Sequence, residues 1–330
     1  MVDITFHQPT TNQSSSPREW IARFVLGMAA ETVFLMALGS ATRVMNAGLA
    51  CPDWPLCYGV LVPQKQMNLQ VFLEWFHRLT ASSMGLFAIA LMGLCWWYRR
   101  DLPKWAPWTA ALALFLVVFQ GLLGGLTVTE LLRFDIVTAH LGTALLFFVT
   151  LLAMGIALRP YQGTGTAGKL PWLGLAATVL VYGQSILGAL VGSQWALHQC
   201  LSDAQLCRVM NSHIVGIFPA TLTTTMLVIG AWRTPALHPT LRKLANLAGG
   251  LVVLQILLGV ATFKLRLQVE PLTVSHQAIG ALLLGSLVAF TVLAFRDVKS
   301  AVASATTNLA ITNAAVISPT DGPPTDGQPA

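Results

Sequence analysis

Residues 74–98 read EWFHRLTASSMGLFAIALMGLCWWY, an apolar stretch with one histidine, His77, near its amino-terminal end. A helix of about 20 such residues crosses the roughly 30 Å hydrocarbon core of a bilayer. The chain contains eight stretches of this kind, near residues 21–44, 74–98, 106–129, 136–158, 172–193, 209–230, 242–263 and 273–295. The sequence therefore predicts an all-α integral membrane protein with eight transmembrane helices.

The composition agrees with a multi-pass membrane protein whose main partner is the lipid bilayer. Of the 330 residues, 55% are hydrophobic and only 10% are charged, unlike a soluble globular domain. The net charge is +6, but the basic residues lie in short clusters between apolar stretches, which argues against nucleic-acid binding. With the amino terminus inside, twelve Lys and Arg residues face the cytoplasm and seven face outward, so both termini are predicted to be cytoplasmic.

Breaks in the apolar pattern divide the chain into two halves. Residues 20–159 and 172–296 each contain four of the predicted helices, and residues 160–171 form a predicted cytoplasmic linker. Residues 1–19 and 297–330 are polar or rich in Pro, Thr and Gly, and we predict both to be disordered cytoplasmic tails.

Four intramembrane histidines repeat at fixed intervals: His77, His140, His213 and His276. Both pairs are 63 residues apart, from 77 to 140 and from 213 to 276, and each histidine is near the start of an even-numbered helix. This register predicts a duplicated unit that forms two pseudo-symmetric four-helix bundles. Because the even helices run in the same direction, the histidines lie at similar depth, so that His77 faces His140 and His213 faces His276.

The odd-numbered helices share a second repeat. A Gln-x-x-Leu-Gly tract occurs at residues 120–124, 184–188 and 255–259, and residues 36–39 carry only the weaker echo Met-Ala-Leu-Gly. Small residues at helix interfaces let neighbouring backbones approach closely in a membrane. We expect the glycines to serve this packing role and the glutamines to hydrogen-bond across the bundle.

Two paired histidines on separate helices suit the axial positions of haem iron. Zinc is the alternative metal, but it usually takes a third or fourth protein ligand in a tetrahedral array. Four unrelated structural histidines are the other alternative, and the duplicated register argues against it, since histidine within membrane spans is usually functional. Gly216 and Gly280 follow the histidines of the second half closely, and would leave room for a flat ligand.

Three charged residues near the first pair are candidates for a role at the site. Glu74 precedes His77 by three residues, so both share a helix face and Glu74 would reach the edge of a macrocycle. The alternative for Glu74 is a helix-start acid that faces water. Arg43 would pair with a ring propionate or, alternatively, snorkel to the interface. Arg78, next to His77, is a further secondary candidate.

Four cysteines form two short-range pairs in predicted outer loops. Cys51 and Cys57 precede the second helix, and Cys200 and Cys207 precede the sixth. An oxidising outer face allows each pair to form a disulfide that staples its loop. A redox role is the alternative, because exposed disulfides exchange with thiol partners.

Several of these motifs, taken in order, resemble one known family. They are Cys51-x-x-Trp54-Pro55-Leu56-Cys57-Tyr58-Gly59, Glu74-x-x-His77-Arg78, the second cysteine pair and the four helix-borne histidines. Together they resemble haem A synthase, particularly its bacterial form with paired cysteines, over about residues 20–296.

The resemblance implies oxidation of a ring methyl of haem O, through a hydroxymethyl stage, to the formyl group of haem A for cytochrome oxidase biogenesis. It implies that His77 and His140 flank substrate haem O, that His213 and His276 ligate a permanent haem b, and that Glu74 is the catalytic carboxylate. It also implies a haem O synthase partner, an electron acceptor whose identity stays open, and a bacterial plasma membrane or another energy-transducing internal membrane. A homo-oligomer is compatible with it.

Two other functions compete with this hypothesis. A diheme cytochrome b that carries electrons across the membrane would place its haems at opposite depths, whereas all four histidines are predicted on one side. A haem transporter would not need Glu74. In the second half Met210 stands at the position of Glu74, so the two halves are chemically unequal.

Overall fold

The computed structural model describes residues 16–193, 204–266 and 268–317, with only the helix path given at 204–207 and 301–317. Within these ranges the chain is helical and has no strand. The long helices are α1 (Pro17–Val44), α2 (Leu69–Trp97), α3 (Ala106–Thr129), α4 (Phe134–Leu158), α5 (Leu170–Ser193), α7 (Ala204–Trp232), α8 (Pro239–Lys264) and α9 (Glu270–Ile317), with a short 3-10 helix η1 (Gln64–Gln66) in the loop before α2. All eight are long and apolar enough to cross a membrane, which confirms the predicted spans.

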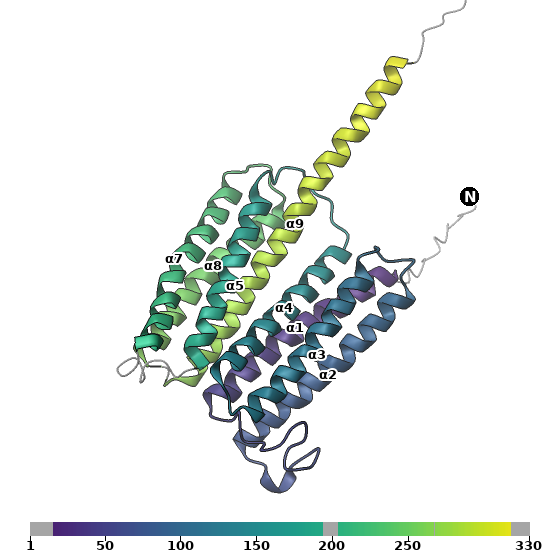
Figure 1. Cartoon of the computed structure of the whole chain (residues 1–330). Helices are drawn as coiled ribbons and strands as arrows, with labels where there is room; N and C mark the ends of the chain where they lie inside the picture. The colour runs from purple at the N-terminus through teal and green to yellow at the C-terminus, as the bar shows by residue number, and fades with distance from the viewer. Residues whose placement is uncertain (1–15, 194–203, 267, 318–330) are drawn as a thin grey trace, which may run out of the picture.

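The eight helices form two bundles that lie side by side (Figure 1). One contains α1 to α4 and the other contains α5, α7, α8 and α9. The bundles meet where α9 packs against α1 and α4 and where α4 packs against α5. The predicted pair of four-helix bundles is therefore confirmed, and α1, α4, α5 and α9 form the interface between them.

The core is continuous through both bundles, and the outer surface is apolar. Fully buried side chains such as Ile21 and Leu151 in the first bundle and Leu284 in the second belong to one hydrophobic cluster. Large apolar side chains also point outward, including Phe218, which is 71% exposed. Such an apolar exterior is expected where lipid tails rather than water surround the helices.

Helix α9 extends beyond the bundle, and this corrects the prediction of a disordered tail from residue 297. The helix continues to Ile317, and Figure 1 shows it projecting past the ends of its neighbours. The physical reason is that residues 297–317 contain neither Gly nor Pro, and the first such breaker is Pro319. At the other end α1 begins at Pro17, inside the predicted tail. Residues 1–15 and 318–330 lie outside the described residues.

The linker between the halves is held by two adjacent residues of α9. Asp297 is completely buried and accepts hydrogen bonds from the backbone N–H groups of Thr164, at 2.7 Å, and Ala167, at 2.9 Å. Arg296 donates to the Ile156 carbonyl oxygen at 2.9 Å, at the end of α4. The middle of α9 therefore joins the last helix of the first bundle and the linker to the second bundle.

We expect Asp297→Ala to destabilise the protein by about 3 kcal/mol, because it would leave two buried N–H groups without an acceptor. Thermal unfolding of the full chain in detergent measures this as a lower denaturation temperature. Asp101→Ala, in the exposed turn between α2 and α3, is the matched control and should leave that temperature unchanged. Equal denaturation temperatures for the two variants would contradict the anchoring role of Asp297.

Candidate functional site

The four histidines lie at one end of the two bundles. His77, His140, His213 and His276 are on α2, α4, α7 and α9, each near the start of its helix. These helix starts are at the end of the molecule that carries the 45–68 loop (Figure 1). His77 and His140 belong to the bundle of α1 to α4, and His213 and His276 belong to the bundle of α5, α7, α8 and α9. The common end of the four helix starts agrees with the shared depth that the sequence predicts, whereas the facing of the two rings of each pair stays a prediction.

Each imidazole packs against a glycine of the preceding helix. A Cβ atom at the glycine would lie 2.9 to 3.3 Å from the histidine Cε1, so any larger residue would require the ring to shift. The distances are 2.9 Å for Gly39 and His77, 3.3 Å for Gly124 and His140, 3.0 Å for Gly188 and His213, and 3.0 Å for Gly259 and His276. The glycines of the sequence repeat are therefore histidine seats as well as helix contacts.

In the second half, glutamines of the same repeat contact the histidines. The Gln184 amide nitrogen lies 3.1 Å from His213 Nδ1 and donates to the His213 carbonyl oxygen at 2.7 Å. The Gln255 amide nitrogen lies 3.3 Å from His276 Nε2. These side chains pack directly on Gly216 and Gly280, which have no side chain to obstruct them, and room for a flat ligand beside those glycines stays a prediction.

The donor groups of each half fit a flat, two-sided metal ligand better than a tetrahedral ion. The Nδ1 atoms of His77, His140 and His276 are buried without a hydrogen-bond partner, although ring nitrogens are strong polar groups. In the part of the chain that the structure describes, no three His, Cys, Asp or Glu side chains gather at one point, as a zinc site usually requires. Paired imidazoles from separate helices match the axial ligation of haem iron.

Glu74 lies one helical turn before His77 and is turned toward the loop that precedes α2. Its side chain is almost fully buried, with 4% of the residue surface exposed. One carboxylate oxygen accepts from the Cys51 backbone N–H at 2.8 Å, and the other pairs with the Arg78 guanidinium at 2.5 Å. Glu74 is therefore a buried, fully partnered carboxylate rather than a helix-start acid facing water.

Arg78 fastens the same loop to α2. Its guanidinium donates to the carbonyl oxygens of Asp53 and Leu56, both at 2.5 Å, and of Cys51 at 3.2 Å. The loop is closed by a disulfide between Cys51 and Cys57, which confirms the first predicted pair. Hydrogen bonds from the Gly59 and Tyr58 backbone and the charge of Arg78 hold the pKa of Asp53 below its usual range. Arg78, a secondary candidate from the sequence, therefore connects Glu74 to the disulfide loop.

Comparison with known proteins identifies the family. The model of the COX15-CtaA family, described as cytochrome oxidase assembly protein, matches residues 22–288, which include all four histidines, Glu74 and both cysteine pairs. The chain belongs to the COX15-CtaA family. The relatives it resembles include the Heme A synthases of Shewanella oneidensis, 29% identical over 82% of this chain and 94% of the relative, and of Caulobacter vibrioides, 28% identical over the same two shares. The Heme A synthase of Rhizorhabdus wittichii is 26% identical over 83% of this chain and 94% of its own length.

In this COX15-CtaA protein the disulfide loop contacts both α2 and α3. Trp54 packs on Gly125, 3.2 Å from the position of a Cβ there, beside the Gly124 seat of His140. On the same face, the Trp75 ring N–H donates to the Leu61 carbonyl oxygen at 2.8 Å. The Cys-x-x-Trp motif signals the loop, but its position above α3 depends on tertiary contacts that the sequence does not show.

Arg43 bridges the two halves instead of lying on the surface. It is in the last turn of α1, and its guanidinium packs directly on Gly192 of α5, one turn beyond the Gly188 seat of His213. Gly192 leaves room for the arginine because it has no side chain. The second predicted cysteine pair, Cys200 and Cys207, lies outside the residues whose side chains the structure describes.

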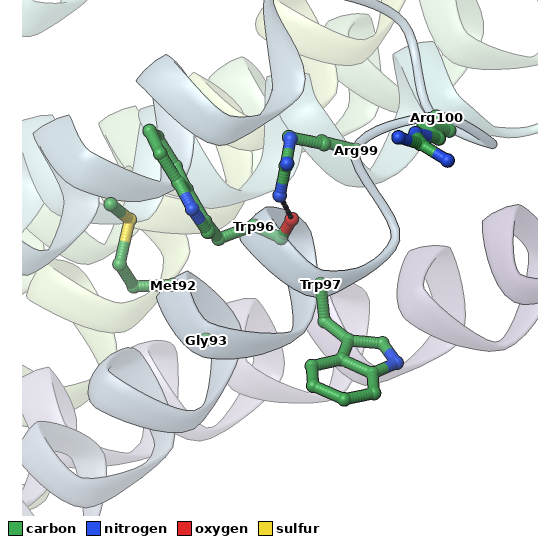
Figure 2. Close-up of a pocket in the computed structure, with 6 residues that line it drawn as sticks. All are labelled: Met92, Gly93, Trp96, Trp97, Arg99 and Arg100. Carbon is green, nitrogen blue, oxygen red and sulfur yellow. Dashed lines mark hydrogen bonds between the residues drawn. The ribbon is translucent and has the colours of Figure 1, made fainter.

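A surface hollow at the other end of α2 is separate from the histidine sites. Figure 2 shows its lining, which consists of Met92, Gly93, Trp96, Trp97, Arg99 and Arg100, around a volume of about 570 Å³. Arg99 donates to the Trp96 carbonyl oxygen at 3.1 Å. Fifteen helical residues separate Met92 from His77, a distance of about 22 Å along the axis. Tryptophan and arginine at a helix end are typical of a bilayer interface.

Proposed function

We propose that this COX15-CtaA protein is a haem A synthase, which oxidises a ring methyl of haem O through a hydroxymethyl intermediate to the formyl group of haem A. The observation that carries this proposal is the combination of two equivalent histidine pairs with a single buried carboxylate, Glu74, beside only one of them. The Heme A synthase relatives, which the chain matches over most of their length, support it.

We propose that the two halves bind different haems. We assign substrate haem O to His77 and His140, because Glu74 and the disulfide loop belong to that half. We assign a resident haem b to His213 and His276, where Met210 replaces the carboxylate. The shared depth of the four histidines argues against a diheme carrier that passes electrons across the membrane.

Conversion of the ring methyl and one water molecule to a formyl group releases four electrons and four protons, of which two protons come from the methyl carbon and two from the water. The resident haem would supply a redox centre that passes electrons to an external acceptor. A bis-histidine iron leaves no open position for dioxygen. We therefore infer that water supplies the oxygen, and that Glu74 accepts a proton from that water or stabilises positive charge that develops at the ring methyl carbon.

The arrangement of the helix ends supports an orientation of the protein in its membrane. The start of α1 and the far end of α9 lie at the same end of the molecule, opposite the disulfide loop (Figure 1). We propose that this end faces the cytoplasm of a bacterial plasma membrane, with the loop and the histidines toward the oxidising outer face. A haem O synthase would supply the substrate, and the acceptor would be a membrane electron carrier.

The direct test is co-expression of the full chain with a haem O source under labelled dioxygen, followed by extraction of the pigments and mass spectrometry. We expect hydroxymethyl and formyl products whose new oxygen is unlabelled, with exchange against solvent controlled by authentic haem A. Bound haem b without either product would favour an electron carrier. Label in the formyl oxygen would overturn the water route while leaving the synthase function intact.

A further inference from the structure

Arg43 is a cation at the boundary between the two bundles. It lies in the last turn of α1 and is only partly exposed. In the part of the chain that the structure describes, its guanidinium has neither a hydrogen bond nor an ion pair. Charged side chains that point into a membrane bundle usually pair with an opposite charge or line a ligand site. An anion that the described residues do not supply is therefore expected beside Arg43.

The position of Arg43 relates it to histidine seats in both halves. It follows Gly39, a histidine seat on α1, by four residues, and it packs on Gly192, which follows the Gly188 seat of His213 by four residues on α5. Both helices run toward the end that carries the 45–68 loop (Figure 1). Four residues of helix span about 6 Å, so Arg43 begins one turn nearer that end than the seats.

The same position of the repeat holds no cation on the other three odd helices. Val128 stands there on α3 and Phe263 on α8, whereas Gly192 is the counterpart of Arg43 in the second half. Because Gly192 has no side chain, the guanidinium of Arg43 can lie against its backbone. The first bundle thus places a positive charge on the helix that seats a histidine of the second bundle.

A second polar group without a partner lies one turn from His276. Thr273 precedes it by three residues on α9 and is 9% exposed, and its hydroxyl oxygen has no hydrogen-bond partner among the described residues. Helix α9 packs against both α1 and α5, and Gln277 donates to the Met36 carbonyl oxygen of α1 at 3.3 Å. Since α1 runs toward the loop end and α9 runs away from it, Thr273 and Arg43 both lie on the loop side of this contact. A buried hydroxyl of this kind is unusual and suits a donor to a ligand.

We propose that Arg43 and Thr273 bind a propionate carboxylate of the haem that His213 and His276 hold. The inference rests on the proposed function, which assigns the resident haem b to that pair. A haem carries two propionates at one edge of its ring, and a guanidinium with a hydroxyl is a suitable donor set for a carboxylate. We assign the contact to this haem rather than to the substrate haem because the guanidinium packs on Gly192, in the second bundle. The cofactor site of one half is then completed by a charge from the other half.

The test measures the reduction potential of haem b and the rate at which it leaves the protein. Arg43→Met removes the charge, Arg43→Lys keeps it, and Thr273→Val removes the hydroxyl with little change of shape. Arg133→Met is the matched control for the loss of one charge at the same end of the molecule, because Arg133 is exposed and pairs with Asp135. Full-length proteins are purified in detergent with haem b bound, titrated spectroelectrochemically and mixed with apomyoglobin to follow haem loss.

We expect Arg43→Met to lower the potential of haem b, because a nearby positive charge favours the ferrous form. The expected change is about tenfold in the ratio of oxidised to reduced haem, or about 59 mV. Haem b should also leave this variant about 10- to 100-fold faster, since a charge-assisted hydrogen bond is lost. Arg43→Lys should restore the potential, and Thr273→Val should speed haem loss with the potential unchanged. Arg133→Met should match the wild type in both measurements.

A wild-type potential in Arg43→Met would overturn the proposal, because an arginine that only joins the bundles would change stability and not the charge at the haem. Glu270, the exposed first residue of α9, is the alternative anion at this end. Haem b loss as fast in Glu270→Gln as in Arg43→Met would identify Glu270 as the partner and would also overturn it.

A His77→Ala background shows which haem Arg43 serves, because it leaves only the second histidine pair intact. The lower potential of Arg43→Met should persist in this background, and its disappearance would contradict the assignment to the second half. All of these measurements need bound haem b and no turnover. Failure of the wild-type protein to form haem A would therefore count against the synthase function alone.

Discussion

Glu74→Gln lowers haem A formation by about 100- to 10,000-fold while haem b stays bound; this is the range typical of a lost general acid or base. The substitution keeps the size of the side chain and an oxygen that can still accept from the Cys51 backbone N–H, so the loop should stay in place. Only the negative charge beside Arg78 and the ability to take a proton are removed. Pigment extraction from cells that supply haem O, with quantification of haem O, the hydroxymethyl intermediate and haem A, measures the effect.

Glu31→Gln is the control for this experiment, because Glu31 is another partly buried acid of the same bundle. It lies on α1 and accepts a hydrogen bond from the Ser83 hydroxyl at 3.2 Å, away from the disulfide loop. Haem A formation should be close to wild type in this variant. If Glu74→Gln also produced haem A at the wild-type rate, Glu74 would be a structural anchor of the loop and the proposed catalytic role would be wrong.

Histidine replacements should separate the two haem sites. His213→Ala or His276→Ala is expected to lower the haem b content of the purified protein by more than about tenfold, since an axial ligand contributes more than the partners that orient it. His77→Ala or His140→Ala should keep haem b and lose haem O binding and haem A formation. Pyridine haemochrome spectra and mass spectrometry of the extracted pigments give the content of each haem per chain.

His238→Ala is the matched control, because His238 lies outside both sites. It caps α8, and its ring accepts from the Thr240 backbone N–H at 3.2 Å. Both pigments should remain at wild-type levels. Loss of haem b in His77→Ala with retention in His213→Ala would reverse the assignment of the two halves and contradict the division proposed above.

Much of the fold follows from local properties of the sequence. Eight apolar stretches each predict a spanning helix, because backbone hydrogen bonds must be satisfied within the segment when lipid surrounds it. The Cys51–Cys57 disulfide follows from short spacing in an outer loop. The repeated 63-residue interval predicts which histidines face each other, since duplication places equivalent residues at equivalent depth. The sequence prediction is wrong for the end of α9, because no helix-breaking residue occurs between residue 297 and Pro319.

Other features depended on contacts between residues far apart in the chain. The buried Asp297 anchors a linker about 130 residues before it, and neither segment carries a local motif for this contact. Glu74 could be assigned to the correct helix face, but not to its contact with the Cys51 amide, because the path of a loop is set by packing. The glutamine tract was evident as a repeat, yet its contact with the histidines required the relative rotation of neighbouring helices.

The sequence by itself therefore determined the membrane helices, their duplication and the residue types that can bind haem, because hydrophobicity and periodicity are local properties. Only the tertiary structure decided that Gln184 and Gln255 contact their histidines and that Glu74 accepts from the Cys51 backbone N–H. A hydrogen bond forms within a few tenths of an ångström of its preferred length, so which groups pair depends on how the helices pack. The chemical difference between the halves, Glu74 against Met210, is already in the sequence, whereas the contacts that these side chains make arise from that packing.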